Sequence, residues 1–131
     1  MNKIQGIYAA SLTVFNEDLS LNLDKTLKHA DFLINNGCHG VVLLGSTGQS
    51  QLISISEKIK LINLIPQSKN FKKFIIGTGS NSLGDTINLI KISMSLNLNH
   101  FLIMPPAYYN YTDKNVIQYF SRIIDSVSAV S

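Results

Sequence analysis

The sequence predicts an α/β fold in which short buried strands alternate with amphipathic helices and form a parallel sheet. Three observations lead to this prediction. Short apolar runs recur along the chain, each run is followed by a segment with helical periodicity, and the connections between them are short. Strands covered by helices on both faces are apolar without strict alternation, as these runs are. Right-handed crossovers would place such strands side by side and parallel.

The first unit begins with the apolar run 7–12, which predicts a strand. Four apolar side chains then recur at helical spacing: Leu23, Leu27, Ala30 and Ile34. Gly37 follows where the C-terminal cap of this helix belongs. The run 41–44 predicts the second strand.

Ser54 and Glu57 have the spacing of a capping box, which predicts the start of the second helix. We expect this helix to end near Ile65, because Pro66 cannot continue it. The run 74–77 then predicts the third strand.

The last two helices and the fourth strand follow the same pattern. Ser82 and Asp85 repeat the capping spacing before the third helix. The run 101–104 predicts the fourth strand, which two prolines end, and Thr112 caps the last helix. Four strand–helix units fit either a small open doubly wound sheet or part of a (β/α)8 barrel, and periodicity does not separate the two.

Length and composition indicate one globular domain, because 131 residues with 45% hydrophobic content can bury a core. No segment has the length of a membrane span or the layout of a signal peptide, and with one cysteine, Cys38, the expected compartment is the cytoplasm. The net charge of +3 is spread over the chain, so nucleic-acid binding is not indicated. The three histidines lack metal-ligand spacing, and no metal site is expected.

Polar side chains follow every predicted strand. They are Thr13 after the first, Ser46 and Thr47 after the second, Thr78, Ser80 and Asn81 after the third, and Tyr108, Tyr109 and Asn110 after the fourth. Parallel α/β folds place their ligand sites at this carboxyl edge. The loop Gly45–Gly48 lacks the lysine of a phosphate-binding loop. A small carboxylate is therefore the favoured ligand, and a strand-to-helix turn built of small residues is the alternative.

Four motifs occur in order along the chain: Gly6 with Thr13 and Phe15, Gly45–Gln49, Gly77–Asn81 and Pro105–Tyr109. Together they resemble the dihydrodipicolinate synthase / N-acetylneuraminate lyase family of class I aldolases. The resemblance implies a (β/α)8 barrel assembled as a homotetramer, of which residues 1–131 would form the N-terminal half, roughly the first four units. It also implies a lysine Schiff base with pyruvate or another 2-oxo acid, and chemistry that needs no metal or organic cofactor.

The resemblance also implies roles for single residues. Thr47 matches the residue that holds the 2-oxo acid carboxylate, with Gly48 beside it, and Thr13 would line the pocket floor. Ser46 and Tyr108 match the hydroxyls of a proton relay, in which the tyrosine of the synthases reaches a neighbouring subunit. Two more positions, Asn81 and Asp85, match residues that bind the feedback inhibitor lysine in some synthases.

The sequence departs from the family pattern at Gln49, where glutamate is usual, and at Ala107, where an aromatic residue is common in the synthases. The family's Schiff-base lysine belongs to the sixth strand and another catalytic tyrosine to the fifth, so both would come after Ser131. None of the ten lysines follows a strand in the required way. We therefore expect a synthase-like aldolase half that is inactive alone. The alternatives are a half-barrel assembly module, a truncated remnant, or an independent flavodoxin-like domain that binds phosphate.

Overall fold

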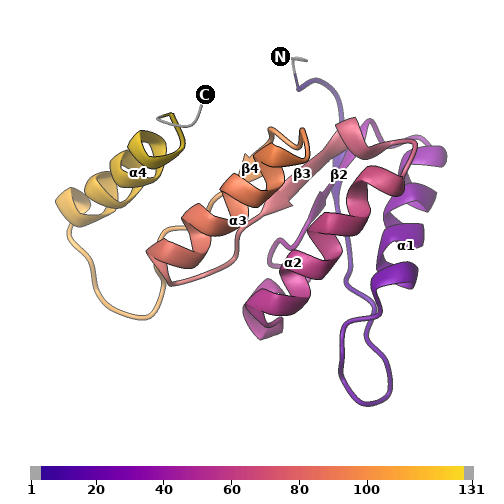
Figure 1. Ribbon diagram of the computed structural model, residues 1–131, viewed down its shortest axis with the longest axis horizontal. Helices are drawn as coiled ribbons and strands as arrows, with labels where there is room; N and C mark the ends of the chain where they lie inside the picture. Colours follow the sequence, from indigo (N-terminus) through magenta and orange to yellow (C-terminus); the bar gives the residue numbers. More distant parts are fainter. Residues whose placement is uncertain (1–3, 129–131) are drawn as a thin grey trace.

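The computed structural model describes residues 4–128, so the ends of the predicted domain, 1–3 and 129–131, lie outside it. Four parallel strands form one sheet, and each strand is followed along the chain by a helix (Figure 1). The strands are β1 (Tyr8–Ala10), β2 (Gly40–Leu43), β3 (Phe74–Gly77) and β4 (Phe101–Leu102). The helices are α1 (Leu23–Asn35), α2 (Ile55–Leu64), α3 (Leu83–Ser95) and α4 (Asp113–Ser128). Three 3-10 turns, which the sequence did not predict, are η1 (Ser50–Leu52), η2 (Ile65–Gln67) and η3 (Phe71–Lys73).

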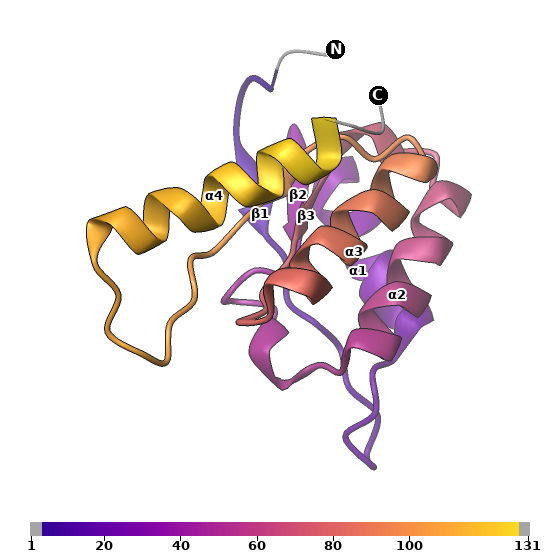
Figure 2. The same ribbon diagram turned by 60° about the vertical axis from the view of Figure 1, so that its left-hand side comes forward.

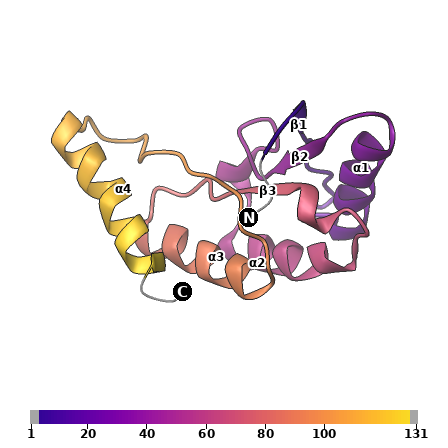
Figure 3. The ribbon, with the colours of Figure 1, turned by 90° about the horizontal axis from the view of Figure 1, so that it is seen from above.

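The order of the strands distinguishes the two architectures that periodicity left open. The sheet runs β1-β2-β3-β4, so every strand pairs with its sequence neighbour. A doubly wound sheet reverses direction at a switch point and departs from sequence order. Helices α1, α2 and α3 lie along one face of the sheet (Figure 3). The described chain is therefore four units of a (β/α)8 barrel, and the flavodoxin-like alternative is wrong.

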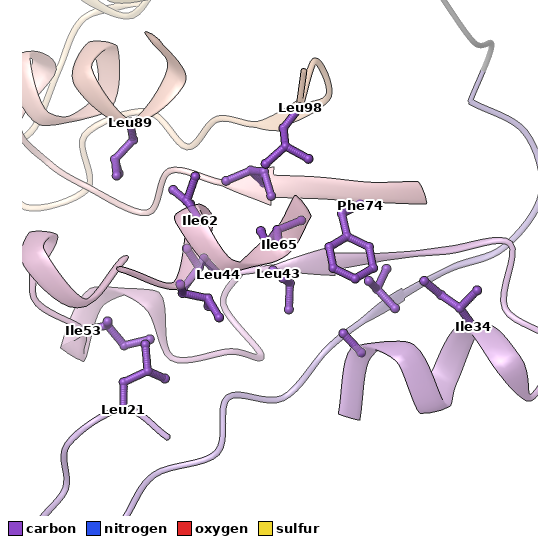
Figure 4. Packing of buried hydrophobic residues seen from close by; sticks show 14 residues of the cluster. Leu21, Ile34, Leu43, Leu44, Ile53, Ile62, Ile65, Phe74, Leu89 and Leu98 are labelled. Atoms are coloured by element: carbon purple, nitrogen blue, oxygen red, sulfur yellow. The ribbon is translucent and has the colours of Figure 1, made fainter. Parts of the chain in front are cut away.

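The two faces of the sheet differ in burial. The register pairs Val41 with Phe74, and both side chains are fully buried against the helices. The neighbouring register pairs Ala10 with Val42 and Val42 with Ile75, and these residues are partly or wholly exposed. They point to the face that would be the inside of a barrel, which no helix covers among residues 4–128. The core thus lies between the sheet and α1–α3 (Figure 4).

Each predicted helix start is confirmed by a cap. Ser54 and Glu57 form a reciprocal capping box at α2, while Ser82 accepts a hydrogen bond from the Asp85 N–H at α3. At the end of α1, Gly37 has a φ of +109°. The Cys38 N–H donates to the Leu33 carbonyl there, which is the bonding pattern of a glycine-ended helix.

The edge strands are shorter than the apolar runs that predicted them. The first run, 7–12, yields three paired residues in β1, and the fourth run, 101–104, yields two in β4. Each of these strands has a neighbour on one side only within the described sheet. Single backbone hydrogen bonds continue beyond both ends of β1, because the His39 N–H donates to the Ile7 carbonyl and the Ser11 N–H donates to the Val42 carbonyl. Beyond the fourth run, Pro105 cannot donate a backbone bond.

Helix α4 follows a long loop and packs against α3 at the end of the row of helices (Figure 2). It packs mainly against α3, through a small apolar cluster that includes Ile90, Tyr119 and Ile123. The Tyr119 hydroxyl also shares a buried hydrogen bond of 3.1 Å with Thr86 of α3. This cluster and the hydrogen bond dock α4 on α3, while β4 joins the fourth unit to the sheet by pairing with β3.

Candidate functional site

The loop after β2 is turned across the top of β3 by one unusual backbone conformation. Leu44 has a φ of +58°, although its side chain is 1% exposed. A branched, buried residue in the left-handed region costs free energy, and such strain is typical of functional sites. Gly77 lies directly beneath, where an added Cβ would come 2.2 Å from the Leu44 carbonyl oxygen. The backbone at Leu44 therefore passes over Gly77, the last residue of β3, which has no side chain.

Residues 45–50, called here the 45–50 loop, form a compact structure that displays its hydroxyls. The Gln49 N–H donates to the Ser46 carbonyl at 3.0 Å, and Gln49 itself has a φ of +53°. Ser46 and Thr47 are exposed at the tip, while the flanking glycines are buried. Ser46 and Thr47 thus lie after β2 at the carboxyl edge of the sheet, and their binding of a ligand stays a prediction.

Thr13 braces the 45–50 loop from the side of β1. Its hydroxyl donates a 2.6 Å hydrogen bond to the Gly48 carbonyl. An added Cβ at Gly48 would approach that hydroxyl to 3.1 Å and the Ser11 carbonyl to 3.2 Å. Thr13 and Gly48 are thus placed together, and their direct contact is with each other.

Lys58 lies behind the loop on α2, and sequence analysis did not identify it. The side chain is 3% exposed, and its Nζ donates to the carbonyls of Gly79 at 2.9 Å and Thr78 at 3.4 Å. Burial lowers the pKa of the Lys58 ammonium below its ordinary value, and the negative charge of Asp85 offsets part of this fall. A signal was present in the sequence, because Lys58 falls on the apolar stripe of the helix with Ile62.

The two residues predicted to be regulatory lie on the turn after β3 and at the start of α3. The Asn81 Oδ1 accepts a 2.9 Å hydrogen bond from the Ala107 N–H, so this amide ties the turn to the loop after β4. Asp85 is half-buried and acts on Lys58 through its charge. Neither observation tests inhibitor binding, which stays a prediction.

Tyr108 lies on the loop after β4 and is 81% exposed. Its ring meets that of Tyr109 edge-on, with centroids 4.9 Å apart, and Tyr109 meets Tyr111 in the same way at 6.5 Å. Within residues 4–128, no hydrogen bond joins Tyr108 to Ser46. The structure therefore places the tyrosine at the rim with its hydroxyl free, and the relay stays a prediction.

A hollow of about 450 Å³ opens between the 45–50 loop and the end of β4. Its wall is mostly apolar, with Leu44, Leu102 and Met104 among the lining residues, and Ser46 supplies a hydroxyl. Thr13, Thr47 and Tyr108 do not line it. Of the residues predicted to form the site, Ser46 alone lines this hollow.

Residues 4–128 hold no group of three His, Cys, Asp or Glu side chains that could bind a metal ion. None of the helices in the same range is long and apolar enough to cross a membrane.

The sequence profile of the dihydrodipicolinate synthetase family matches residues 3–130. The chain belongs to this family. Among relatives, the 4-hydroxy-tetrahydrodipicolinate synthase of Ehrlichia canis is 33% identical over 125 residues, which make up 95% of this chain and 42% of that protein. The recognition made from the four ordered motifs is confirmed.

Solved structures of the dihydrodipicolinate synthetase family and of N-acetylneuraminate lyase superpose on the chain. YagE, a prophage protein of E. coli K12 in complex with pyruvate, gives a TM-score of 0.84 at 28% identity, over 95% of this chain and 42% of that one. The N-acetylneuraminate lyase of Proteus mirabilis gives a TM-score of 0.84 at 28% identity, over 95% and 43%. The chain therefore spans less than half the length of the proteins it matches.

Proposed function

We propose that the chain is the N-terminal portion of a class I aldolase, a carbon–carbon lyase that acts on pyruvate or another 2-oxo acid through a lysine Schiff base. Among such enzymes it is proposed to be 4-hydroxy-tetrahydrodipicolinate synthase-like, because the relative from Ehrlichia canis bears that name. The observation that carries the proposal is the 45–50 loop, which displays two hydroxyls at the carboxyl edge of a half-barrel. The working enzyme is proposed to be a cytoplasmic homotetramer.

In this mechanism the 45–50 loop grips the substrate at its carboxylate. The Thr47 hydroxyl and backbone N–H donate hydrogen bonds to the two oxygens, and the braces at Gly48 and Gly79 keep the loop from shifting. A preorganised grip leaves the keto carbon in one place, where an amine can attack it. Thr47 is therefore the residue whose loss weakens binding directly.

Ser46 and Tyr108 serve as the proton relay. Imine formation and the carbon–carbon bond change both require protons to leave one oxygen or carbon and reach another. Ser46 lines the hollow, and Tyr108 stands exposed at the rim of the molecule, from where it would act in a neighbouring subunit. The cationic iminium supplies the electron sink, and its lysine belongs to the second half of the barrel rather than to residues 1–131.

Trapping with pyruvate and borohydride tests the division of labour between the halves. Reduction of an imine adds a stable mass to the lysine that formed it, which intact-mass and peptide mass spectrometry locate. We expect no adduct on the ten lysines of this chain. An adduct on any of them, above that on the unfolded chain as control, contradicts the proposed location of the reactive lysine.

Pyruvate binding by the unreactive chain tests the carboxylate grip itself. Titration of the ¹⁵N-labelled chain with pyruvate is expected to shift the amide signals of Ser46 and Thr47. Thr47→Val keeps the shape of the side chain and removes its hydroxyl, so the shifts should saturate at a concentration about tenfold higher, the loss of one hydrogen bond to a charged group. Phosphate titrated in place of pyruvate is the control, and a preference for phosphate contradicts the proposal.

A second candidate function is that of an assembly module that pairs with a separate C-terminal half. The observation in its favour is that β1 and β4 each have one unpaired edge in the described sheet. Mixing the chain with the C-terminal half of a synthase from this family should give a one-to-one complex. Recovery of borohydride trapping in that complex, but not in either half, supports both candidates together. A complex that never traps pyruvate supports assembly without catalysis.

A further inference from the structure

Lys58 is buried in a position where an apolar side chain would pack without the cost of burying a charge. The residue is 3% exposed and sits beside Leu61 and Ile62 in the buried stripe of α2. Lysines are rarely buried unless paired. Within the described chain the salt bridge found is between Lys28 and Asp24, so no carboxylate contacts the Lys58 ammonium. Its partners are backbone carbonyls.

Those carbonyls belong to the start of residues 78–81, called here the 78–81 turn. Nζ lies 2.9 Å from the Gly79 carbonyl oxygen and 3.4 Å from that of Thr78. A hydrogen bond from a charged donor is roughly twice as strong as a neutral one, and two carbonyls on one ammonium fix a direction as well as a distance. Lys58 therefore holds the 78–81 turn against the beginning of α2.

The 78–81 turn presses on the 45–50 loop. Gly79 has a φ of +44°, and an added Cβ would lie 1.9 Å from the Ser50 hydroxyl oxygen. The Ser50 side chain is 3% exposed and its hydroxyl has no partner within residues 4–128, so contact with Gly79 rather than hydrogen bonding sets its place. Thr13 holds the opposite side of the loop through Gly48. The loop is thus held between a hydroxyl from one side and the lysine-fixed turn from the other.

The same turn also supports the loop that carries Tyr108. Asn81, at its far end, accepts the Ala107 N–H at 2.9 Å, one residue before the tyrosine. A displacement of the 78–81 turn would therefore move both the 45–50 loop and the backbone at Tyr108. These are the two segments that bear the proposed relay hydroxyls.

From this connectivity we infer that Lys58 is a positioning residue for the carboxylate grip and the relay. It couples the loops after β2 and β4 by fixing the turn between them, without touching substrate. The inference deepens the proposed function, because an effect of Lys58 on pyruvate binding rests on that function. An effect of Lys58 on the order of the two loops does not rest on it.

Hydrogen exchange in Lys58→Met tests the inference, because methionine keeps most of the stem and removes the donors. We expect exchange of the Ser50 and Ala107 amides to accelerate by about tenfold or more, while α1 amides keep their rates. Lys58→Arg keeps the charge and the donors and should restore slow exchange at both amides. The matched control is Lys60→Met, on an exposed position of the same helix, which should change neither. Unchanged exchange at both amides in Lys58→Met overturns the inference.

Asn81→Ala separates coupling through the turn from a local effect of the lysine. Removal of the Asn81 acceptor should release the Ala107 amide and leave Ser50 slow. If Lys58→Met does not fold, the ¹⁵Nζ signal of Lys58 in the unaltered chain gives a second measurement. A protected ammonium whose signal shifts in Asn81→Ala supports coupling across the turn, and one that exchanges freely overturns it.

Pyruvate titrations of the same variants complete the test. If the proposed function is right, Lys58→Met should bind pyruvate about tenfold more weakly and Lys58→Arg should recover most of that loss. If no variant, including the unaltered chain, binds pyruvate, the proposed function fails while the exchange data still decide the role of Lys58. Equal pyruvate affinity in Lys58→Met and the unaltered chain overturns the positioning role.

Discussion

At the scale of single residues, the site is shaped by places where a side chain is missing. Gly77 lets the Leu44 carbonyl pass over the end of β3, and Gly79 lets the turn rest on Ser50. In both cases the space that a Cβ would need is already occupied. The 45–50 loop therefore depends on glycines outside it as much as on its own.

Gly77→Ala is expected to destabilise the fold strongly, because its Cβ would lie 2.2 Å from a backbone oxygen that cannot rotate away. Overpacking of this kind costs more than about 2 kcal/mol in the free energy of unfolding, which urea titration followed by circular dichroism measures. Gly84→Ala is the matched control, because the nearest atom there is 3.9 Å away and the residue lies in α3. This variant should be neutral or more stable by up to about 1 kcal/mol. Equal losses at the two positions would contradict the packing described here.

The stability of the fold depends on pH through the carboxyl group of Glu57. Hydrogen bonds from the Ser54 hydroxyl and from the Leu21 N–H hold the pKa of its carboxyl below the ordinary value of 4.5. A lowered pKa in the folded state means that the stabilisation is present above pH 4.5 and is lost as pH falls through the lowered pKa. The thermal midpoint of Glu57→Gln should therefore lie below that of the unaltered chain at pH 7 and approach it at about pH 3.

Ser54→Ala is the companion variant for this pH dependence. It removes the 2.6 Å hydrogen bond that contributes most to the lowered pKa of Glu57, and should reduce the same slope without abolishing it. Because Asp18 also has a lowered pKa, through Ser20, some acid sensitivity should persist in both variants. A gap between Glu57→Gln and the unaltered chain that stays constant from pH 7 to about pH 3 would be the contrary result.

Sequence reasoning located the exposed hydroxyls of the site but not the buried charge that supports them. Ser46 and Thr47 could be found because polar residues after a strand have to meet at one edge. Lys58 could not be placed in the same way, since a lysine on a helix is usually solvated and only its position in the apolar stripe argued otherwise. The unusual φ of Leu44 had no signal in the sequence, because it is imposed by tertiary contacts with β3.

At the scale of elements, caps and strand ends were predictable where local chemistry determines them. The capping box at Ser54 and the glycine end of α1 form where the sequence placed them. The lengths of β1 and β4 were overestimated, because pairing depends on neighbours that the local sequence does not specify. The 3-10 turns were missed for a related reason, because they form in connections whose path is set by the packed elements on either side.

Helix α4 is docked on α3 by the apolar cluster around Ile123 and by one buried hydrogen bond. Tyr119→Phe removes the 3.1 Å hydrogen bond with Thr86. The Thr86 hydroxyl then loses this partner, although Thr86 is 0% exposed. The expected cost is about 1–2 kcal/mol, concentrated in α4, so amides of 113–128 should exchange faster while those of α1 do not. Tyr111→Phe is the control, because that ring is 41% exposed and meets Tyr109 edge-on. Uniform acceleration along the whole chain would show instead that α4 unfolds with the rest.

At the scale of the whole molecule, the chain has a covered face and an open one. Helices α1–α3 cover one side of the sheet (Figure 3). The other side, which faces the inside of a barrel, carries Leu102 at 49% exposure. Ile7 at 71% and Leu12 at 54% flank β1 at the other edge. Unpaired parallel edges next to exposed apolar side chains favour association with further strands.

The 131-residue chain on its own should therefore self-associate and bind the dye ANS, and the open face should be responsible. Leu102→Lys places a charge on that face at the edge strand, where the exposed side chain is not needed for the core, so it should lower both dye fluorescence and the mass measured by light scattering. Ile117→Lys makes the same change on α4, at a side chain that is 65% exposed and away from the sheet, and should leave both values unchanged. If Ile117→Lys lowered the dye fluorescence and the mass and Leu102→Lys did not, the associating surface would be α4 rather than the open face of the sheet.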